Sequence, residues 1–225
     1  MRVELIRYTP EPDDLCGFAA SLCTNAKNRE SALMGALSKG HSSISEHATF
    51  SFLISGVSRA LLAQLTRHRI ASFSVQSQRY ISSAKTFEYV VPPSICELGE
   101  VEETEYRRQM DIMHGWYREW QERLLAVGRT KQEANEDARF VLPNAAATKL
   151  LVTMNARELE HFFELRTCNR AQWEIRRMAD KMLIECRKAA PSIFKNSGCA
   201  CMQGKPCPEG RMCCGKPRKL EDLEA

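Results

Sequence analysis

Arginines, serines and a histidine gather in one short stretch of the chain. It begins with Arg67-His68-Arg69, contains three serines and ends with Arg79-Tyr80. A guanidinium is a planar fork of donors that fits a phosphate bidentately, and serine hydroxyls add neutral donors beside it. The arginine-rich segment, residues 67–80, therefore indicates a site for a phosphate or an anionic ring.

The same residue types also have a purely structural explanation. The preceding residues, from Ala60 to about Thr66, are mostly apolar and follow Ser58, which can cap a helix. Cations at the C-terminus of such a helix interact favourably with its dipole, by about 0.3–1 kcal/mol each, with no ligand involved. The composition of the segment leaves both explanations open.

Two other kinds of site have weaker support. Ser77 lacks the Gly-x-Ser-x-Gly turn of a nucleophilic serine, and no base stands at an obvious position. His41 and His47 have only Glu46 beside them, which falls short of the usual ligand set of a metal site. We therefore expect neither a nucleophilic serine nor a metal here.

The elements that must position the segment include few strands and many helices. Alternating apolar residues predict strands near Val3 to Leu5, over 50–54 and over 87–91. Caps and helical spacing predict helices over 15–22, with Asp13 or Asp14 as cap, and over 30–37, 60–66, 106–127 and 171–189. From Glu133 the pattern is mostly helical, with an interruption at Pro143. The fold class expected is α/β of the α+β type.

The helix over 106–127 has one apolar face, with apolar residues spaced three or four apart. Packing of that face into the core is the simpler explanation. A seam between subunits is the alternative, because coiled coils use the same spacing.

Composition indicates a globular protein. The chain has 225 residues, 44% of them hydrophobic, which is enough to bury a core. No apolar run approaches the roughly 20 residues of a membrane span, and residues 1–8 do not resemble a signal peptide. We expect a cytoplasmic protein with one domain over 1–194, no membrane partner and no nucleic-acid partner.

The last residues, 195–225, form a basic tail rich in cysteine. Of the net charge of +4, residues 195–219 carry +5 by themselves, so the rest of the chain sums to −1. Five of the ten cysteines lie in this tail, without the paired Cys-x-x-Cys spacing of zinc ribbons. The tail is expected to be a flexible extension, with a zinc or iron–sulfur site as the alternative.

The arginine-rich segment resembles the signature of flavin-dependent thymidylate synthases. The shared features are the arginine-histidine-arginine start, a serine five residues after the first arginine, and a later serine and arginine-tyrosine. Further matching pieces lie at Gly40-His41, Glu46-His47, Arg139 to Pro143, Asn155-Ala156-Arg157 and Leu165-Arg166, so the resemblance covers nearly all of 1–194.

The resemblance implies an FAD site and a dUMP site. The residues it implies for FAD are His41, Ser43, Arg67, His68, Arg69, Val75, Asn155, Ala156, Arg157 and His161. Those it implies for dUMP are Gln64, Leu65, Thr66, Arg67, Val75, Gln76, Ser77, Gln78, Arg79, Arg139 and Arg166, with Arg166 as the catalytic residue. Many family members have asparagine, glutamate and asparagine where this chain has Ser74, Val75 and His161.

The implied reaction is reductive methylation of dUMP to dTMP. Methylenetetrahydrofolate would give the one-carbon unit, reduced FAD the hydride, and NADPH would recharge the flavin. No Gly-rich dinucleotide loop is present, so side chains and helix ends must bind the FAD. The resemblance also implies a homotetramer with sites shared between subunits. The competing hypothesis is a nucleic-acid- or metal-binding regulator that works through the tail.

Overall fold

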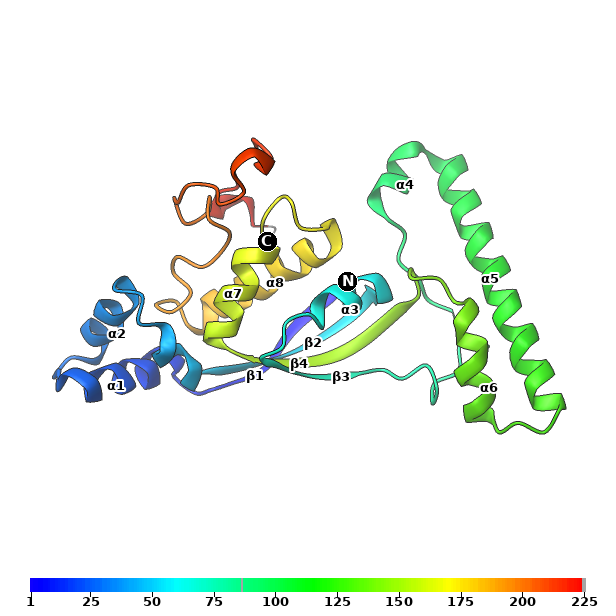
Figure 1. Ribbon diagram of the computed structural model, residues 1–225, viewed down its shortest axis with the longest axis horizontal. Coiled ribbons are helices and arrows are strands. Elements are labelled where there is room, and N and C mark those ends of the chain that lie inside the picture. Colours follow the sequence, from blue (N-terminus) through cyan, green and yellow to red (C-terminus); the bar gives the residue numbers. More distant parts are fainter. Residues whose placement is uncertain (86, 224–225) are drawn as a thin grey trace. The chain divides into compact units, whose positions relative to one another are not determined.

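The computed structural model describes residues 1–85 and 87–223 (Figure 1). Contacts divide the chain into two compact units. Unit 1 comprises Met1–Ile54, Gln64–Phe73 and Leu151–Ala225, and unit 2 comprises Ser55–Ala63 and Ser74–Leu150. The two units are described one after the other.

Four strands form one sheet in the order β1-β2-β4-β3. They are β1 Arg2–Tyr8, β2 Thr49–Ser58, β3 Ala71–Val75 and β4 Ala147–Asn155. The end of β1 meets the start of β2, where the Thr9 N–H donates to the Thr49 carbonyl at 3.0 Å. The start of β2 faces the end of β4, where the Ser51 and Thr153 hydroxyls lie 2.7 Å apart. Neighbouring strands therefore run antiparallel, and with the helices this makes the fold α+β.

Unit 1 packs helices against its part of the sheet. These helices are α1 Pro12–Thr24, α2 Arg29–Ser38, α7 Ala156–Arg166 and α8 Trp173–Ala189, together with the short 3-10 helix η1 Ser42–His47. Helices α1 and α2 pack on each other, α7 packs on α8, and α8 packs on β1 (Figure 1). Phe50, Phe163 and Phe194 meet edge to face at centroid distances of 5.4 and 5.9 Å in the core.

The start of α1 differs from the prediction that Asp13 or Asp14 caps it. Its N-cap is Glu11, in a left-handed conformation, with no side-chain cap. The Asp13 carboxylate instead accepts the backbone N–H groups of Ser192 and Ile193 at 2.8 and 3.1 Å. Asp13 thus stabilises the chain after α8, a long-range partner that local spacing does not show.

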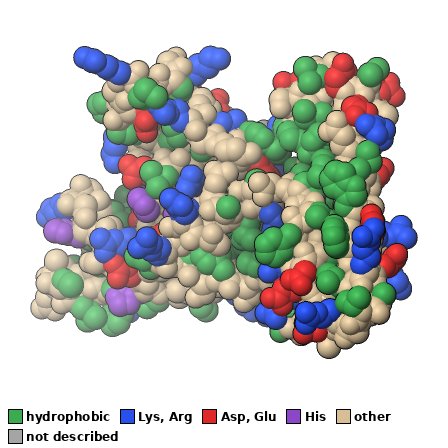
Figure 2. Space-filling model, turned by 45° about the vertical axis from the view of Figure 1, so that its right-hand side comes forward, with side chains coloured by type: hydrophobic (Ala, Val, Ile, Leu, Met, Phe, Trp, Pro, Cys, Tyr) green, Lys and Arg blue, Asp and Glu red, His purple; other side chains and the backbone are tan. Residues whose placement is uncertain are grey.

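Unit 2 contains α4 Pro93–Leu98, α5 Glu100–Ala126 and α6 Lys131–Ala138, and most of α3 Arg59–Leu65. On α5, Met110 and Tyr117 are buried, which confirms core packing for part of the apolar face. Trp116 and Trp120 on the same helix are about half exposed. Figure 2 shows hydrophobic side chains gathered on the surface of the part that carries α4 to α6.

The predicted strand over 87–91 is wrong, and two strands were not predicted. Only Tyr89 of that stretch makes a bridge, to Ala146, because Pro92 and Pro93 follow at once. Strand β4 buries every second residue, yet its Leu, Lys and Met are also good helix formers. Pairing in the sheet, and not local propensity, made these residues a strand.

The tail prediction is wrong for the part that packs on unit 1. Cys199, Ala200 and Met202 are buried, and so is Arg218. The Arg218 guanidinium donates to both carboxylate oxygens of Asp180 at 2.9 and 3.0 Å and to the Thr167 carbonyl at 2.6 Å. This part of the tail is held by specific contacts and is not a loose extension. None of the helices in 1–85 and 87–223 combines the length and apolar character of a membrane span.

Candidate functional site

The arginine-rich segment begins where α3 ends and continues into β3. The Arg67 and His68 backbone N–H groups donate to the carbonyls of Gln64 and Leu65 at 3.3 and 3.1 Å, which closes the last turn of the helix. Arg67 and Arg69 then extend outward and are exposed, whereas His68 between them is buried. The alternating pattern gives the segment one buried anchor and two accessible cations.

His68 links two residues of α7 within unit 1. The Arg166 Nε–H donates to His68 Nε2 at 3.1 Å, so Nε2 is the acceptor nitrogen of the ring. The ring proton then lies on Nδ1, which donates to Glu158 Oε1 at 3.2 Å. The ring of Phe162 packs edge-on against the imidazole at 4.9 Å. Both His68 nitrogens are therefore engaged inside the protein.

The electrostatics of this cluster keep the histidine neutral. Burial, with help from Arg166 and His161, lowers the His68 pKa to about 4. Burial also raises the pKa of Glu158. A neutral imidazole is the form that can accept from Arg166, and the bond fixes that arginine while its terminal nitrogens remain available.

Arg166 and Arg67 form a pair of like charges. Burial and the nearby Arg67 both lower the Arg166 pKa, which still leaves a guanidinium charged at neutral pH. Arg67 and Arg69 have no ion-pair partner within 1–85 and 87–223. Cations left without carboxylates in this way can bind an anion without first breaking an ion pair.

A second part of unit 1 is a cavity of about 690 Å³ between α2, α7 and the chain after α8. Arg157 and His161, both implied for FAD, line this cavity. Ser42 also lines it, whereas its neighbours His41 and Ser43, which the resemblance implies for FAD, are not among the lining residues. Arg157 pairs with Glu46, and Asn155 caps α7 by accepting the Glu158 N–H at 2.9 Å. Ala156 is buried, and its N–H donates to the Ala48 carbonyl at 2.8 Å.

Glu160, which lies in the same cavity wall, was not singled out in the sequence. Burial raises its pKa to about 7, although Arg157 and Lys205 lower it in part. Its charge therefore changes near neutral pH, which an acid in a helix sequence gives no sign of.

The predicted nucleotide residues fall into two sets. Gln64, Leu65, Thr66, Arg67 and Arg166 belong to unit 1. Val75, Gln76, Ser77, Gln78, Arg79 and Arg139 belong to unit 2. Each set contains cations and neutral donors, which are the groups that an anionic nucleotide needs.

In unit 2, Gln76, Ser77 and Gln78 line a cavity of about 360 Å³. Arg79 does not line it, and its guanidinium Nε lies 2.8 Å from the Glu136 carboxylate. The Ser77 hydroxyl accepts the Arg79 backbone N–H at 3.2 Å, an ordinary turn contact, and its side chain contacts no base within the described part of the chain.

Arg59 is a cation of this cavity that the sequence analysis missed. One of its terminal nitrogens donates to the Gln76 carbonyl at 2.8 Å, and burial and Arg139 lower its pKa. Its buried Nε has no hydrogen-bond partner among the described residues. Arg59 is the first residue of α3 and directly follows the last residue of β2, and this position in the sequence gave no sign of its contact with Gln76.

Two of the five tail cysteines, Cys199 and Cys201, are close neighbours. The Cys199 and Cys201 sulfurs lie 3.5 Å apart. Within 1–85 and 87–223, no group of three or more histidine, cysteine or acidic side chains is arranged to hold a metal ion. All ten cysteines are free thiols.

The fold and these clusters define an α+β protein with accessible arginines arranged for anionic ligands. Comparison with known proteins agrees on one family. The family model described as thymidylate synthase complementing protein matches residues 4–192. The flavin-dependent thymidylate synthase of Nitratidesulfovibrio vulgaris is 46% identical over 96% of this chain and 94% of its own. Those of Geobacter sulfurreducens and Clostridium tetani are 45% and 40% identical, over 99% of this chain and 97% and 96% of their own.

The chain therefore belongs to the flavin-dependent thymidylate synthase family, and it is an enzyme. The family match confirms the resemblance seen in the arginine-rich segment. The competing hypothesis of a nucleic-acid- or metal-binding regulator has no support in these comparisons.

Proposed function

We propose that this enzyme makes dTMP from dUMP by reductive methylation. Methylenetetrahydrofolate donates the one-carbon unit, and NADPH is the reductant. FAD, when bound and reduced, supplies the hydride. The observation that carries the proposal is the anchored Arg166, held by neutral His68 at 3.1 Å near Arg67, which has no ion-pair partner in the described part of the chain.

The residues of unit 1 fit a flavin dinucleotide. FAD has two phosphates, which need cationic and amide donors. Arg67 and Arg69 are exposed without carboxylate partners in the described part of the chain, and Arg157 and His161 line a cavity of about 690 Å³. The other unit 1 residues proposed for FAD are His41, Ser43, His68, Asn155 and Ala156, and Val75 of unit 2 is proposed with them. His68 and Asn155 contribute by positioning, since their side chains are engaged within the protein.

Arg166 stabilises negative charge on the pyrimidine. Loss of the N3 proton, or movement of charge onto a ring carbonyl, makes the uracil ring anionic, and a fixed guanidinium lowers the energy of that state. The bond from Nε to His68 leaves the terminal nitrogens free to donate to the ring. Arg166 cannot be a general base, because it remains protonated.

A second copy of the chain completes the nucleotide site, in a homotetramer. The family resemblance implies sites shared between subunits, so Arg67 and Arg166 of one subunit would act together with Ser77, Arg79 and Arg139 of another. The exposed apolar side chains of α5 supply a surface that subunit contact would bury. Ten free thiols suit a reducing compartment, and we place the enzyme in the cytoplasm.

Purified protein tests the function. We expect a yellow protein with a flavin spectrum that changes when dUMP is added, and formation of dTMP from dUMP, methylenetetrahydrofolate and NADPH. Omission of each component in turn is the control, and each omission should stop the reaction. Flavin-free protein that fails to bind added FAD, or dTMP formation without flavin, would contradict the proposal.

A further inference from the structure

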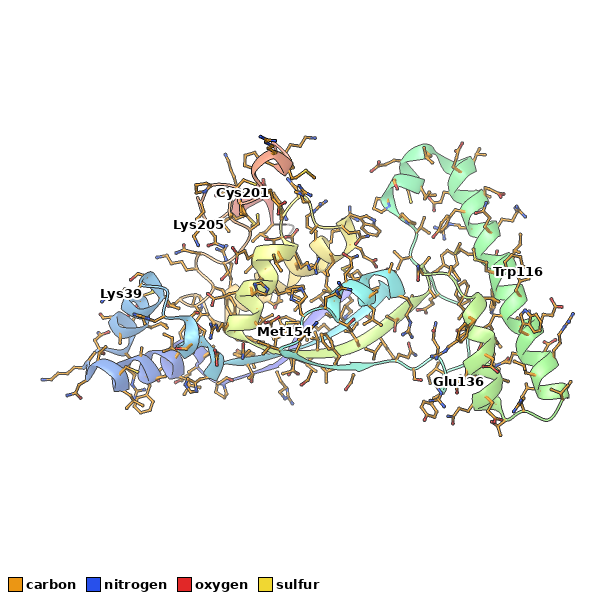
Figure 3. The ribbon with its side chains drawn as sticks, viewed as in Figure 1. Lys39, Trp116, Glu136, Met154, Cys201 and Lys205 are labelled. Atoms are coloured by element: carbon orange, nitrogen blue, oxygen red, sulfur yellow. The ribbon has the colours of Figure 1, made fainter. Side chains whose placement is uncertain are left out.

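The C-terminal segment after α8 forms part of the wall of the unit 1 cavity of about 690 Å³, which is proposed to hold FAD. Gln203 and Lys205 line that cavity together with Arg157, Glu160 and His161. Both residues lie beyond 4–192, the part that the family model matches. Figure 3 shows Lys205 on the loop of this segment, on the side nearer to α2.

The wall is built by specific hydrogen bonds. The Cys199 N–H donates to the Thr167 hydroxyl at 2.8 Å, which joins the segment to the end of α7. The Lys205 N–H donates to the Ala200 carbonyl at 2.9 Å, and the Gln203 side-chain amide donates to the Gly198 carbonyl at 2.6 Å. Further along, Arg218 anchors the segment to Asp180. The backbone that carries Lys205 is therefore held in place.

The Lys205 ammonium acts electrostatically on Glu160 in the cavity wall. Lys205 is near enough to lower the pKa of Glu160 on α7, and no hydrogen bond or ion pair engages its ammonium group within 1–85 and 87–223. A flexible ammonium on a fixed backbone can reach a phosphate and bind it as a point charge. Arg157, which lines the same cavity, has part of its charge offset by Glu46.

We propose that Lys205 is a phosphate-binding residue for the FAD, supplied by the cysteine-rich tail to the cavity that Arg157 also lines. This inference rests on the proposed function, since it names a further residue of the same cofactor site. It gives the tail a direct part in cofactor binding, which the sequence analysis did not assign to it.

The test measures FAD and riboflavin binding to flavin-depleted full-length protein. Riboflavin has the flavin ring but no phosphate. Lys205→Ala should weaken FAD binding about three- to tenfold, as loss of one partly exposed charge contact does, and leave riboflavin binding unchanged. Lys205→Arg should restore FAD binding. Added salt should weaken FAD binding more in the wild type than in Lys205→Ala.

Lys219→Ala is the matched control, because Lys219 is an exposed lysine of the same segment that does not line the cavity. It should bind FAD as the wild type does. If wild type binds FAD and Lys205→Ala binds it within about twofold of the same affinity, the inference fails and the proposed function stands. Equal weakening of FAD and riboflavin would show a structural role and also overturn the inference. A wild type that binds no FAD would overturn both.

Discussion

His68 and Arg166 are close neighbours in space, although 98 residues separate them in the chain. Their contact gives each residue a definite state: the histidine is neutral with its proton on Nδ1, and the arginine is fixed through Nε. The resemblance assigns His68 to the flavin, and in the structure its side chain accepts a hydrogen bond from Arg166 Nε. An exposed, mobile arginine would lose more conformational entropy when it binds the ring than this anchored one does.

Arg166→Lys should reduce turnover by about 100-fold or more, because a lysine keeps the charge but lacks both the Nε donor and the terminal fork. Folding and flavin content should stay close to those of the wild type. The measurement is dTMP formation and flavin content in the same preparation. Arg118→Lys, at an exposed position on α5, is the control. Near-normal turnover in Arg166→Lys would remove Arg166 from the mechanism.

His68 should make the folded protein sensitive to acid. Its pKa is about 4 in the folded state against 6.5 for an unperturbed histidine. Between these values the unfolded chain takes up a proton that the folded protein excludes, so stability falls as the pH drops from about 6.5 to about 4. The loss should be at most about 3 kcal/mol. Urea unfolding should show a smaller loss in His68→Gln, whereas His47→Gln, at an exposed site, should behave as the wild type.

Helix α7 carries several functional groups because of its helical period. Arg157, Glu160, His161 and Glu164 repeat three or four residues apart and line one cavity. Glu158, Phe162 and Phe163 face the core on other sides of the helix. One helix thus presents a ligand-facing surface and a surface that holds His68.

Glu160 should make FAD binding depend on pH. Its pKa of about 7 means that it gains negative charge as the pH rises from about 6 to about 8, which opposes a phosphate in the same cavity. FAD should bind more tightly to Glu160→Gln than to the wild type at pH 8, and the difference should shrink at pH 6. His161, Glu164, Arg157 and Lys205 face the same cavity, so the difference between the two proteins is the quantity to measure. Equal affinities at pH 8 would contradict this prediction.

Arg218 anchors the tail to the rest of unit 1 by its ion pair with Asp180. The Arg218 and Asp180 side chains are 8% and 4% exposed, so removal of either partner leaves a buried charge without this ion pair. Arg218→Gln should cost about 3–5 kcal/mol of unfolding free energy, and adding Asp180→Asn should recover much of it. Lys219→Gln, an exposed neighbour, should change little. The sequence predicts that truncation after Asn196 is harmless, whereas these contacts predict a less stable protein. A cost below about 1 kcal/mol for Arg218→Gln would favour the sequence-based prediction.

At the scale of the whole molecule, the residues proposed for the nucleotide belong to two compact units of the chain. Arg166 belongs to unit 1 and Arg79 to unit 2. The apolar side chains left exposed on α5, among them Trp116 and Trp120, are what a subunit contact would cover. The proposed sharing of sites between subunits would make assembly part of catalysis and not only of stability.

Subunit mixing tests this expectation. Arg166→Ala and Arg79→Ala should each be inactive alone. If each site combines unit 1 of one subunit with unit 2 of another, a site is intact when its unit 1 comes from the Arg79→Ala subunit and its unit 2 from the Arg166→Ala subunit. Each of these conditions holds for half of the sites in a random mixture, so mixing should restore roughly a quarter of the sites. Mixtures should be dissociated and reassembled before assay, and unmixed variants taken through the same steps are the control. No recovery in mixed assemblies of confirmed composition would place each site within one subunit.

The sequence by itself determined the family, the arginine-rich segment and the long helices. Arg67, Ser77 and Arg79 could be named because their residue types and spacing are local properties of the chain. Helices such as α5 and α8 followed from a period that repeats along the sequence. The α+β class followed from the same patterns.

The tertiary structure decided which residues became partners. Strand β4 became a strand because it pairs with β2 and β3, although its residues also suit a helix. Asp13 binds the chain after α8, His68 holds Arg166, and Arg218 anchors the tail, all through contacts between distant parts of the chain. The pKa values of His68 and Glu160 depend on burial by such contacts. Desolvation and long-range hydrogen bonds exist only once the chain has folded, so no local pattern in the sequence records them.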